Sequence, residues 1–115
     1  MKRLLFFIAT MLAAAQTHAG TLITPSFTVK IDVQCEEGNV TCDKVGYLGT
    51  SRKTGKSLSL RGKTLHGMCA DGVTPCRFLG YAFKNGDTSY LVLDEGTLLV
   101  KRGDEVLLKE NGKWD

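Results

Sequence analysis

The sequence predicts a single all-β domain, an antiparallel meander that closes as a small barrel or folds as a sandwich. Three observations indicate it: a period-two alternation of apolar and polar side chains, tight-turn dipeptides at short intervals, and four cysteines in one short chain. The 115 residues suffice for one domain, and a composition with 43% hydrophobic and 23% charged residues is typical of a chain that folds.

The N-terminus is typical of a secretory signal peptide over residues 1–19. Lys2 and Arg3 give a basic start, residues 4–15 are almost entirely apolar, and residues 17–19 (Thr-His-Ala) resemble a cleavage site. An apolar run of about 12 residues is too short to span a bilayer, which needs about 20. A lipoprotein would require a cysteine just after the cleavage point, but the first cysteine is Cys35. We therefore expect a mature domain over 20–115 that is periplasmic or secreted and has no transmembrane segment.

Loss of Lys2 and Arg3 would leave 13 basic and 12 acidic residues, a net charge of +1 instead of the full chain's +3. These charges are mixed along the chain. Binding to nucleic acid requires a clustered basic face. We therefore do not expect a nucleic acid among the partners.

The expected strands follow one another along the chain with short turns between them. In the first, 27–33, the side chains of Phe27, Val29, Ile31 and Val33 alternate with polar ones. Residues 20–26 are expected to be a loose leader into it. Further strands are expected over 43–50, 56–61, 77–84, 88–94, 97–102 and 105–110. The turns between them carry pairs such as Asn85-Gly86, which take the positive φ that hairpin turns need.

The four cysteines, Cys35, Cys42, Cys69 and Cys76, predict two disulfides in an oxidising compartment. Three connectivities are possible. The local pairing Cys35–Cys42 with Cys69–Cys76 is favoured because each pair encloses a six-residue polar loop. Each small loop would stabilise the fold by about 2–3 kcal/mol on a chain-entropy estimate. A zinc site is disfavoured, since paired ligands usually lie two to four residues apart, and we expect no metal or cofactor.

The two Cys loops also match each other at an offset of 34 residues, both reading C-x-acid-G-x-x-x-C. Gly46-Tyr47 then falls on Gly80-Tyr81 in the same register. This indicates two duplicated units, 35–68 and 69–102. The alternative is coincidence in a chain rich in Gly and Leu. Tyr47 and Tyr81 are expected to pack in the core.

Catalytic groups are few in the expected mature domain. Its only histidine is His66, which is expected in a connection over Gly62–Gly67. His66 could serve as a base for Ser57 or Ser59, oriented by Asp71, but nothing in the spacing favours that trio. No free thiol remains if both disulfides form. We therefore do not expect an enzyme.

Candidate partner-binding residues lie in two basic loops, 51–56 and 84–88. Loops held by a rigid scaffold are where binding residues concentrate. The residues singled out are Arg52, Lys53, Lys56, Lys84 and Asn85. Trp114, next to the C-terminus, is expected to pack back on the barrel.

Residues 69–114, with the core TPCRFLGYAFKNG, resemble small exported proteins of Gram-negative bacteria. Residues 80–108 resemble the periplasmic inhibitors of C-type lysozyme. That resemblance implies a disulfide-bonded β-barrel that inserts a loop into the lysozyme cleft. The family's inhibitory Ser-Gly-x-x-Tyr motif is not reproduced in residues 85–90, so no inhibitory residue is carried over.

The expected function is that of an exported, non-enzymatic binding protein for a protein or a cell-envelope component. Steric inhibition of a hydrolase such as lysozyme is its most concrete form, with a rigid loop blocking the cleft. The alternatives are a small periplasmic hydrolase that uses His66 and a structural envelope or stress protein.

Overall fold

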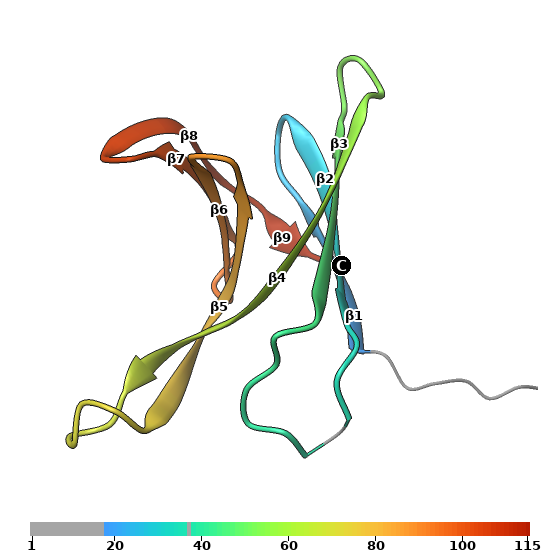
Figure 1. Cartoon of the computed structure of the whole chain (residues 1–115). Coiled ribbons are helices and arrows are strands. Elements are labelled where there is room, and N and C mark those ends of the chain that lie inside the picture. Colours follow the sequence, from blue (N-terminus) through green and yellow to red (C-terminus); the bar gives the residue numbers. More distant parts are fainter. Residues whose placement is uncertain (1–17, 37) are drawn as a thin grey trace, which may run out of the picture.

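The structure, a computed structural model, describes residues 18–36 and 38–115. It confirms the all-β class. The described residues form nine strands, without a helix, in one antiparallel sheet of order β8-β7-β6-β5-β4-β3-β2-β1-β9 (Figure 1). Consecutive strands pair from β1 to β8, so the chain is the expected meander. Residues 1–17 of the expected signal peptide lie outside the described residues.

The bounds of the strands are β1 (His18–Ile23), β2 (Phe27–Val33), β3 (Val45–Ser51), β4 (Ser57–Met68), β5 (Pro75–Asn85), β6 (Thr88–Leu93), β7 (Thr97–Arg102), β8 (Glu105–Asn111) and β9 (Lys113–Trp114).

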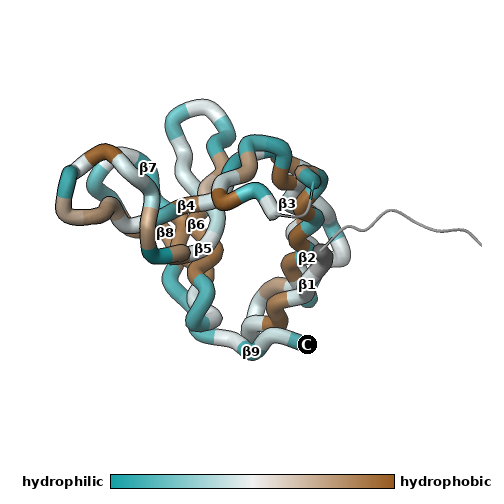
Figure 2. The backbone as a smooth tube through the Cα atoms, turned by 90° about the horizontal axis from the view of Figure 1, so that it is seen from below, coloured by the Kyte–Doolittle hydropathy of each residue, from teal (hydrophilic) through white to brown (hydrophobic). Residues whose placement is uncertain are grey.

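The sheet almost closes on itself because β8 and β9, separated only by Gly112, pair with opposite edges. β8 pairs with β7, whereas β9 pairs with β1, and β9 can be followed across the gap in the view along the barrel (Figure 2). A Cβ atom at Gly112 would lie 2.2 Å from the Ile23 carbonyl oxygen, so only glycine permits this close passage. The result is one nearly closed, barrel-like sheet.

The opposite corner of the barrel is made by β4, which changes partners at Gly62. Residues 57–62 pair with β3 and residues 62–68 pair with β5, so Gly62 faces both Val45 and Phe83. A Cβ atom here would lie 2.0 Å from the Ala82 carbonyl oxygen. The two glycine corners divide the sheet into two facing walls.

Between the walls lies a core of alternate inward side chains, centred on Tyr47. Its ring lies 5.1 Å from the Phe83 ring and 5.6 Å from the Tyr90 ring, centroid to centroid, and so joins β3 to β5 and β6. Tyr81 is half-buried against the same core, which confirms the expected packing of both tyrosines. The remaining buried apolar residues are Leu22, Val29, Ile31, Cys42, Val45, Val92, Leu98 and Val100.

Trp114 packs back on the barrel, as expected. Its Nε1–H donates to the Asp94 carbonyl oxygen at 2.9 Å, and its ring lies 3.3 Å from where a Cβ atom at Gly20 would stand. The C-terminal strand is therefore held to β1 on one side and to the β6–β7 turn on the other.

Two expectations for the strands were wrong. Residues 20–26 are not a loose leader, because 18–23 form β1 and pair with both β2 and β9. The strand expected over 56–61 continues to Met68. Gly62 and Gly67 suggested a connection there, but both lie within β4, and Gly62 marks a close backbone approach.

Both expected disulfides are present, Cys35–Cys42 and Cys69–Cys76, with Cα–Cα separations of 5.8 and 5.2 Å. In both 34-residue units a Cys loop leads into a strand that carries an inward tyrosine. The correspondence ends beyond these strands: residues 57–68 form a single strand, whereas their counterparts, 91–102, contain the β6–β7 turn.

Candidate functional site

The two disulfide loops lie at the same end of the barrel, because every second connection of an antiparallel meander lies at the same end. The first is the β2–β3 loop with Cys35–Cys42, and the second is the β4–β5 hairpin with Cys69–Cys76 (Figure 1). We call this the disulfide end. The β4–β5 hairpin is splayed away from the other strands there (Figure 1).

The turn of the β4–β5 hairpin is organised by Asp71. Its carboxylate accepts the backbone N–H groups of Val73 and Thr74, both at 2.9 Å, and also the Thr74 hydroxyl. These hydrogen bonds, the hydroxyl first among them, lower the pKa of Asp71 to about 2. The Cys69 N–H donates to the Thr74 carbonyl at 2.8 Å, and Gly72 takes a φ of +77°. The turn therefore has a fixed shape, and it carries Val73 with 76% of its surface exposed.

The β2–β3 loop is fixed to β4 through Cys42, which is buried. The Cys42 N–H donates to the Thr64 hydroxyl at 3.0 Å, and the Thr64 N–H donates to the Cys42 carbonyl at 2.8 Å. The disulfide then ties Cys35 to this anchored residue. Val40 in the same loop is 68% exposed.

Two cavities, of about 340 and 430 Å³, lie against the β2–β3 loop. Both are lined by the Cys35–Cys42 disulfide, Thr64 and His66. Phe78 and Tyr81 also line the first cavity, and Met68 and Pro75 also line the second. Met68 is 56% exposed. The disulfide end thus combines concave surface with exposed apolar side chains on a covalently constrained backbone, an arrangement suited to docking on another molecule.

His66 lies in β4 at this end, not in a connection as expected. Its Nε2 is 3.0 Å from the Thr64 hydroxyl, and its ring packs edge-on against Phe78 at 5.6 Å. Its Nδ1 is buried without a hydrogen-bond partner among the described residues. Since the Thr64 hydroxyl also accepts the Cys42 N–H, His66 belongs to the anchor of the β2–β3 loop.

The structure does not bring together the trio considered for catalysis. Ser59 is seven residues from His66 on the same strand, about 23 Å along it, and Ser57 is farther still. Both serines are exposed, and the Ser57 hydroxyl is hydrogen-bonded to that of Thr50. The Asp71 carboxylate is occupied by its own turn.

The basic loops singled out from the sequence lie at the other end of the barrel. Arg52, Lys53 and Lys56 belong to the β3–β4 turn, and Lys84 and Asn85 end β5. All five are exposed.

Arg52 differs from the other four because it has a structural role. Its guanidinium donates to the Thr24 carbonyl at 2.8 Å, and its backbone N–H donates to the Ser26 carbonyl at 2.9 Å. It therefore holds the β1–β2 turn against the β3–β4 turn.

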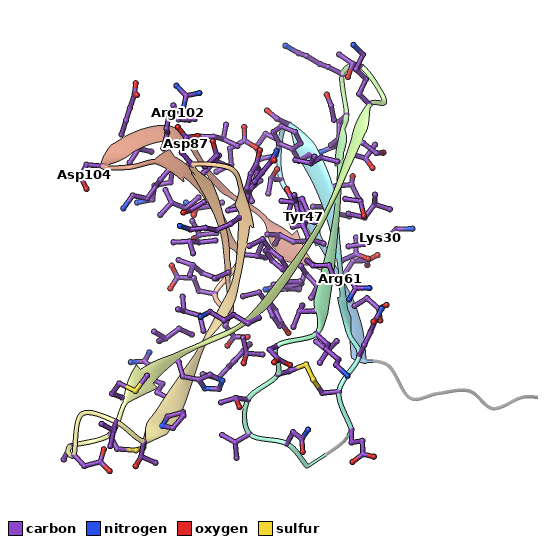
Figure 3. The ribbon with its side chains drawn as sticks, in the orientation of Figure 1. Lys30, Tyr47, Arg61, Asp87, Arg102 and Asp104 are labelled. Atoms are coloured by element: carbon purple, nitrogen blue, oxygen red, sulfur yellow. A yellow bond between two sulfur atoms is a disulfide. The ribbon has the colours of Figure 1, made fainter. Side chains whose placement is uncertain are left out.

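Lys84 lies in a basic groove on the outer face that the sequence did not reveal. The groove has a volume of about 460 Å³, and Arg61 and Lys63 line it with Lys84 over a floor that includes Ala82 and Leu91. Arg61 is seen on the outer side of β4 (Figure 3). The alternation of residues 57–63 would have placed both cations on one face, had that strand been extended past Gly62.

Within residues 18–36 and 38–115, no three side chains among His, Cys, Asp and Glu lie close enough to hold a metal ion. A helix long and apolar enough to cross a membrane does not occur in the same residues. Comparisons with protein-family models, curated proteins and solved structures found no match to the chain. The resemblance to lysozyme inhibitors therefore stays a hypothesis.

Proposed function

We propose that the chain is an exported, non-enzymatic binding protein that docks on another protein through its disulfide end. The observation that carries this proposal is Val73, 76% exposed on a turn that is fixed by a disulfide and by the hydrogen bonds of Asp71. A rigid turn that presents an exposed apolar side chain loses little conformational entropy on docking, and this suits a protein that inserts into a cleft.

Rigidity supports this proposal in energetic terms. Ordering a flexible loop on binding costs about 0.5–1.5 kcal/mol for each side chain that is immobilised. The β4–β5 turn is already ordered in the free protein, so most of that cost falls on folding instead. Inhibition of a hydrolase by occupation of its cleft, with C-type lysozyme as the first candidate, is the most concrete form of the proposal.

The cellular location is part of the same proposal. The two disulfides are compatible with an oxidising, exported compartment. A periplasmic or secreted location, and the removal of residues 1–19 on export, would place the disulfide end where it meets envelope proteins and extracellular hydrolases.

The test is an assay of lysozyme activity with increasing amounts of the oxidised protein, combined with capture of purified envelope hydrolases. Val73→Asp places a charge at the tip and should abolish inhibition and capture. Val106→Asp is the matched control, because Val106 is 54% exposed on β8 and therefore lies outside the disulfide end. An equal loss of inhibition and capture in both variants would contradict docking by the disulfide end. Inhibition and capture that survive Val73→Asp would contradict it as well.

A second pair of variants tests the basic loops. Lys53→Glu and Lys84→Glu reverse charges at the opposite end. If they abolish capture while Val73→Asp does not, the partner binds at the basic loops instead. A folded, oxidised protein that captures none of these hydrolases would refute the inhibitor form of the proposal.

A further inference from the structure

The end of the barrel opposite the disulfide end holds a cavity of about 340 Å³ inside the sheet. Its walls come from strands on both sides of the barrel, β2, β3 and β4 on one side and β6, β7 and β8 on the other. The cavity is therefore part of the barrel interior and is not a surface groove. Its volume falls within the range of small-molecule sites, about 300–1,000 Å³. The apolar lining includes Phe27, Tyr47, Leu58, Tyr90, Leu98 and Leu108.

The cavity opens at the β3–β4 hairpin, since its lining also includes Lys56 and Ser57, which are exposed. Lys56 forms its hydrogen bonds through its backbone: its N–H donates to the Thr54 hydroxyl, and its carbonyl accepts the Ser51 N–H. No hydrogen bond of its ammonium group occurs among the described residues. The mouth of the cavity thus carries one cation that is available to a ligand.

Tyr47 supplies a polar group within this apolar lining. The residue is only 4% exposed, and no hydrogen bond of its hydroxyl occurs within residues 18–36 and 38–115. The ring lies along β3 over Gly49, where an added Cβ atom would be 2.5 Å from the tyrosine hydroxyl oxygen. Because Gly49 is two residues nearer to the β3–β4 turn, the hydroxyl points toward the mouth, the side on which Lys56 lies. Figure 3 shows Tyr47 between the two walls of the barrel.

Burial raises the pKa of Tyr47 to about 12, with a smaller contribution from Tyr90. The phenol is therefore protonated at neutral pH and can donate a hydrogen bond. The hydroxyl oxygen keeps accessible surface at the cavity, so a ligand oxygen there can accept its hydrogen bond.

We propose that this cavity binds a small organic acid, with the apolar body of the ligand inside the barrel and its carboxylate at the mouth, between the Tyr47 hydroxyl and Lys56. The walls exclude water from the body of the ligand. The two polar groups select the acid over a neutral molecule of the same shape. This site lies at the opposite end from the protein-docking surface and does not depend on it.

The experiment is an NMR titration of the oxidised protein with 4-phenylbutyrate and decanoate, with 4-phenylbutanol as the neutral match. At least one acid should shift the amide signals of residues that line the cavity. If 4-phenylbutyrate binds, 4-phenylbutanol should bind at least fivefold more weakly. Failure of both acids, or equal binding of alcohol and aromatic acid, would overturn the proposal.

Variants identify the two polar groups. Tyr47→Phe keeps the ring and removes only the hydroxyl, and Lys56→Gln removes the cation at an exposed position. Each variant should bind the acid about fivefold more weakly, which is the effect of losing one partly exposed contact to a charged group. Lys30→Gln is the matched control, because Lys30 points away from the barrel on the outer face (Figure 3). If Lys56→Gln and Lys30→Gln have the same effect, the acid does not bind at this mouth.

Discussion

The Glu110 carboxylate accepts both hydrogens that Ser26 can offer, the backbone N–H at 3.0 Å and the hydroxyl at 2.6 Å. Ser26 lies in the β1–β2 turn and Glu110 lies in β8. Neither β1 nor β2 pairs with β8. The carboxylate therefore joins the two edges of the sheet beside the short β1–β9 ladder. Closure of the barrel rests on a charged side chain as well as on backbone hydrogen bonds.

Loss of this carboxylate should destabilise the barrel in a pH-dependent way. Burial opposes ionisation of Glu110, but hydrogen bonds from Ser26 and Thr24 outweigh it and hold the pKa below its usual value. A lowered pKa in the folded state stabilises the fold above the unfolded value, about 4.5, and this stabilisation is lost as pH falls through the folded pKa. Glu110→Gln should cost about 1 kcal/mol at pH 7 and much less at pH 3, measured by urea unfolding. Asp104→Asn, in the exposed β7–β8 turn, is the control and should change little at either pH.

The passage of the chain through Gly112 should not tolerate a side chain. Gly112→Ala would force the new methyl group against the Ile23 carbonyl, so β9 should separate from β1. Because Trp114 is the only tryptophan, its fluorescence should shift to longer wavelength while most of the sheet persists. Gly46→Ala is the control, since its Cβ atom would meet ordinary contacts at 3.7 Å. An unchanged emission spectrum in Gly112→Ala would refute this account of closure.

The two disulfides should differ in what their removal costs. They close loops of equal size, so the entropic contribution of each is about 2–3 kcal/mol. Cys42 is buried in the core and anchored to Thr64, whereas Cys76 is exposed. Replacing Cys35 and Cys42 by Ala should therefore lower the free energy of unfolding more than the same replacement at Cys69 and Cys76. Denaturant unfolding of the two double variants measures the difference, and a larger loss for the second pair would contradict it.

Alkaline pH should destabilise the protein through Tyr47. Its pKa, raised to about 12 by burial, lies above the ordinary value of 10.0. This contribution to stability is fully present below pH 10 and is lost as pH rises toward 12. A tyrosinate absorbance titration should show one of the three tyrosines ionising near pH 12 in the folded protein. Tyr47→Phe should remove that step and flatten the dependence of unfolding free energy on pH between 10 and 12.

The parts of the fold that depend on local sequence could be predicted. Residues 27–33 alternate strictly, and period-two alternation is a local property of a half-buried strand. Of the three possible disulfide connectivities, the one present is the local pairing that was favoured because each cysteine pair encloses a short polar loop. The turn at Asn85-Gly86 likewise takes the expected positive φ, at Gly86.

Elements that depend on distant partners could not be predicted. Residues 18–23 become a strand because β2 and β9 supply hydrogen bonds on both sides, and β9 lies at the far end of the chain. Gly62 suggested a break in β4, although it is the residue that lets the strand pair with both neighbours.

The same limit applies to the sites. The sequence pointed to the basic loops by their charge, but whether a side chain is free depends on tertiary contacts, as with Arg52 and the Thr24 carbonyl. The exposure of Val73 and the open side of Tyr47 are likewise properties of the folded barrel. Residue type alone gave no signal for either, since valine is most often buried and tyrosine is intermediate.

The pairing of Leu22 with Trp114 joins almost the first described residue to almost the last. A nascent chain that emerges N-terminus first can form its hairpins one after another, but it cannot close the ring until its final residues are available. Until then β1 keeps an unpaired edge, and the cost of bringing the ends together is not yet offset by their contacts. The timing of ring closure is thus set by residues 113–115, and a chain that lacks them would stay open along β1.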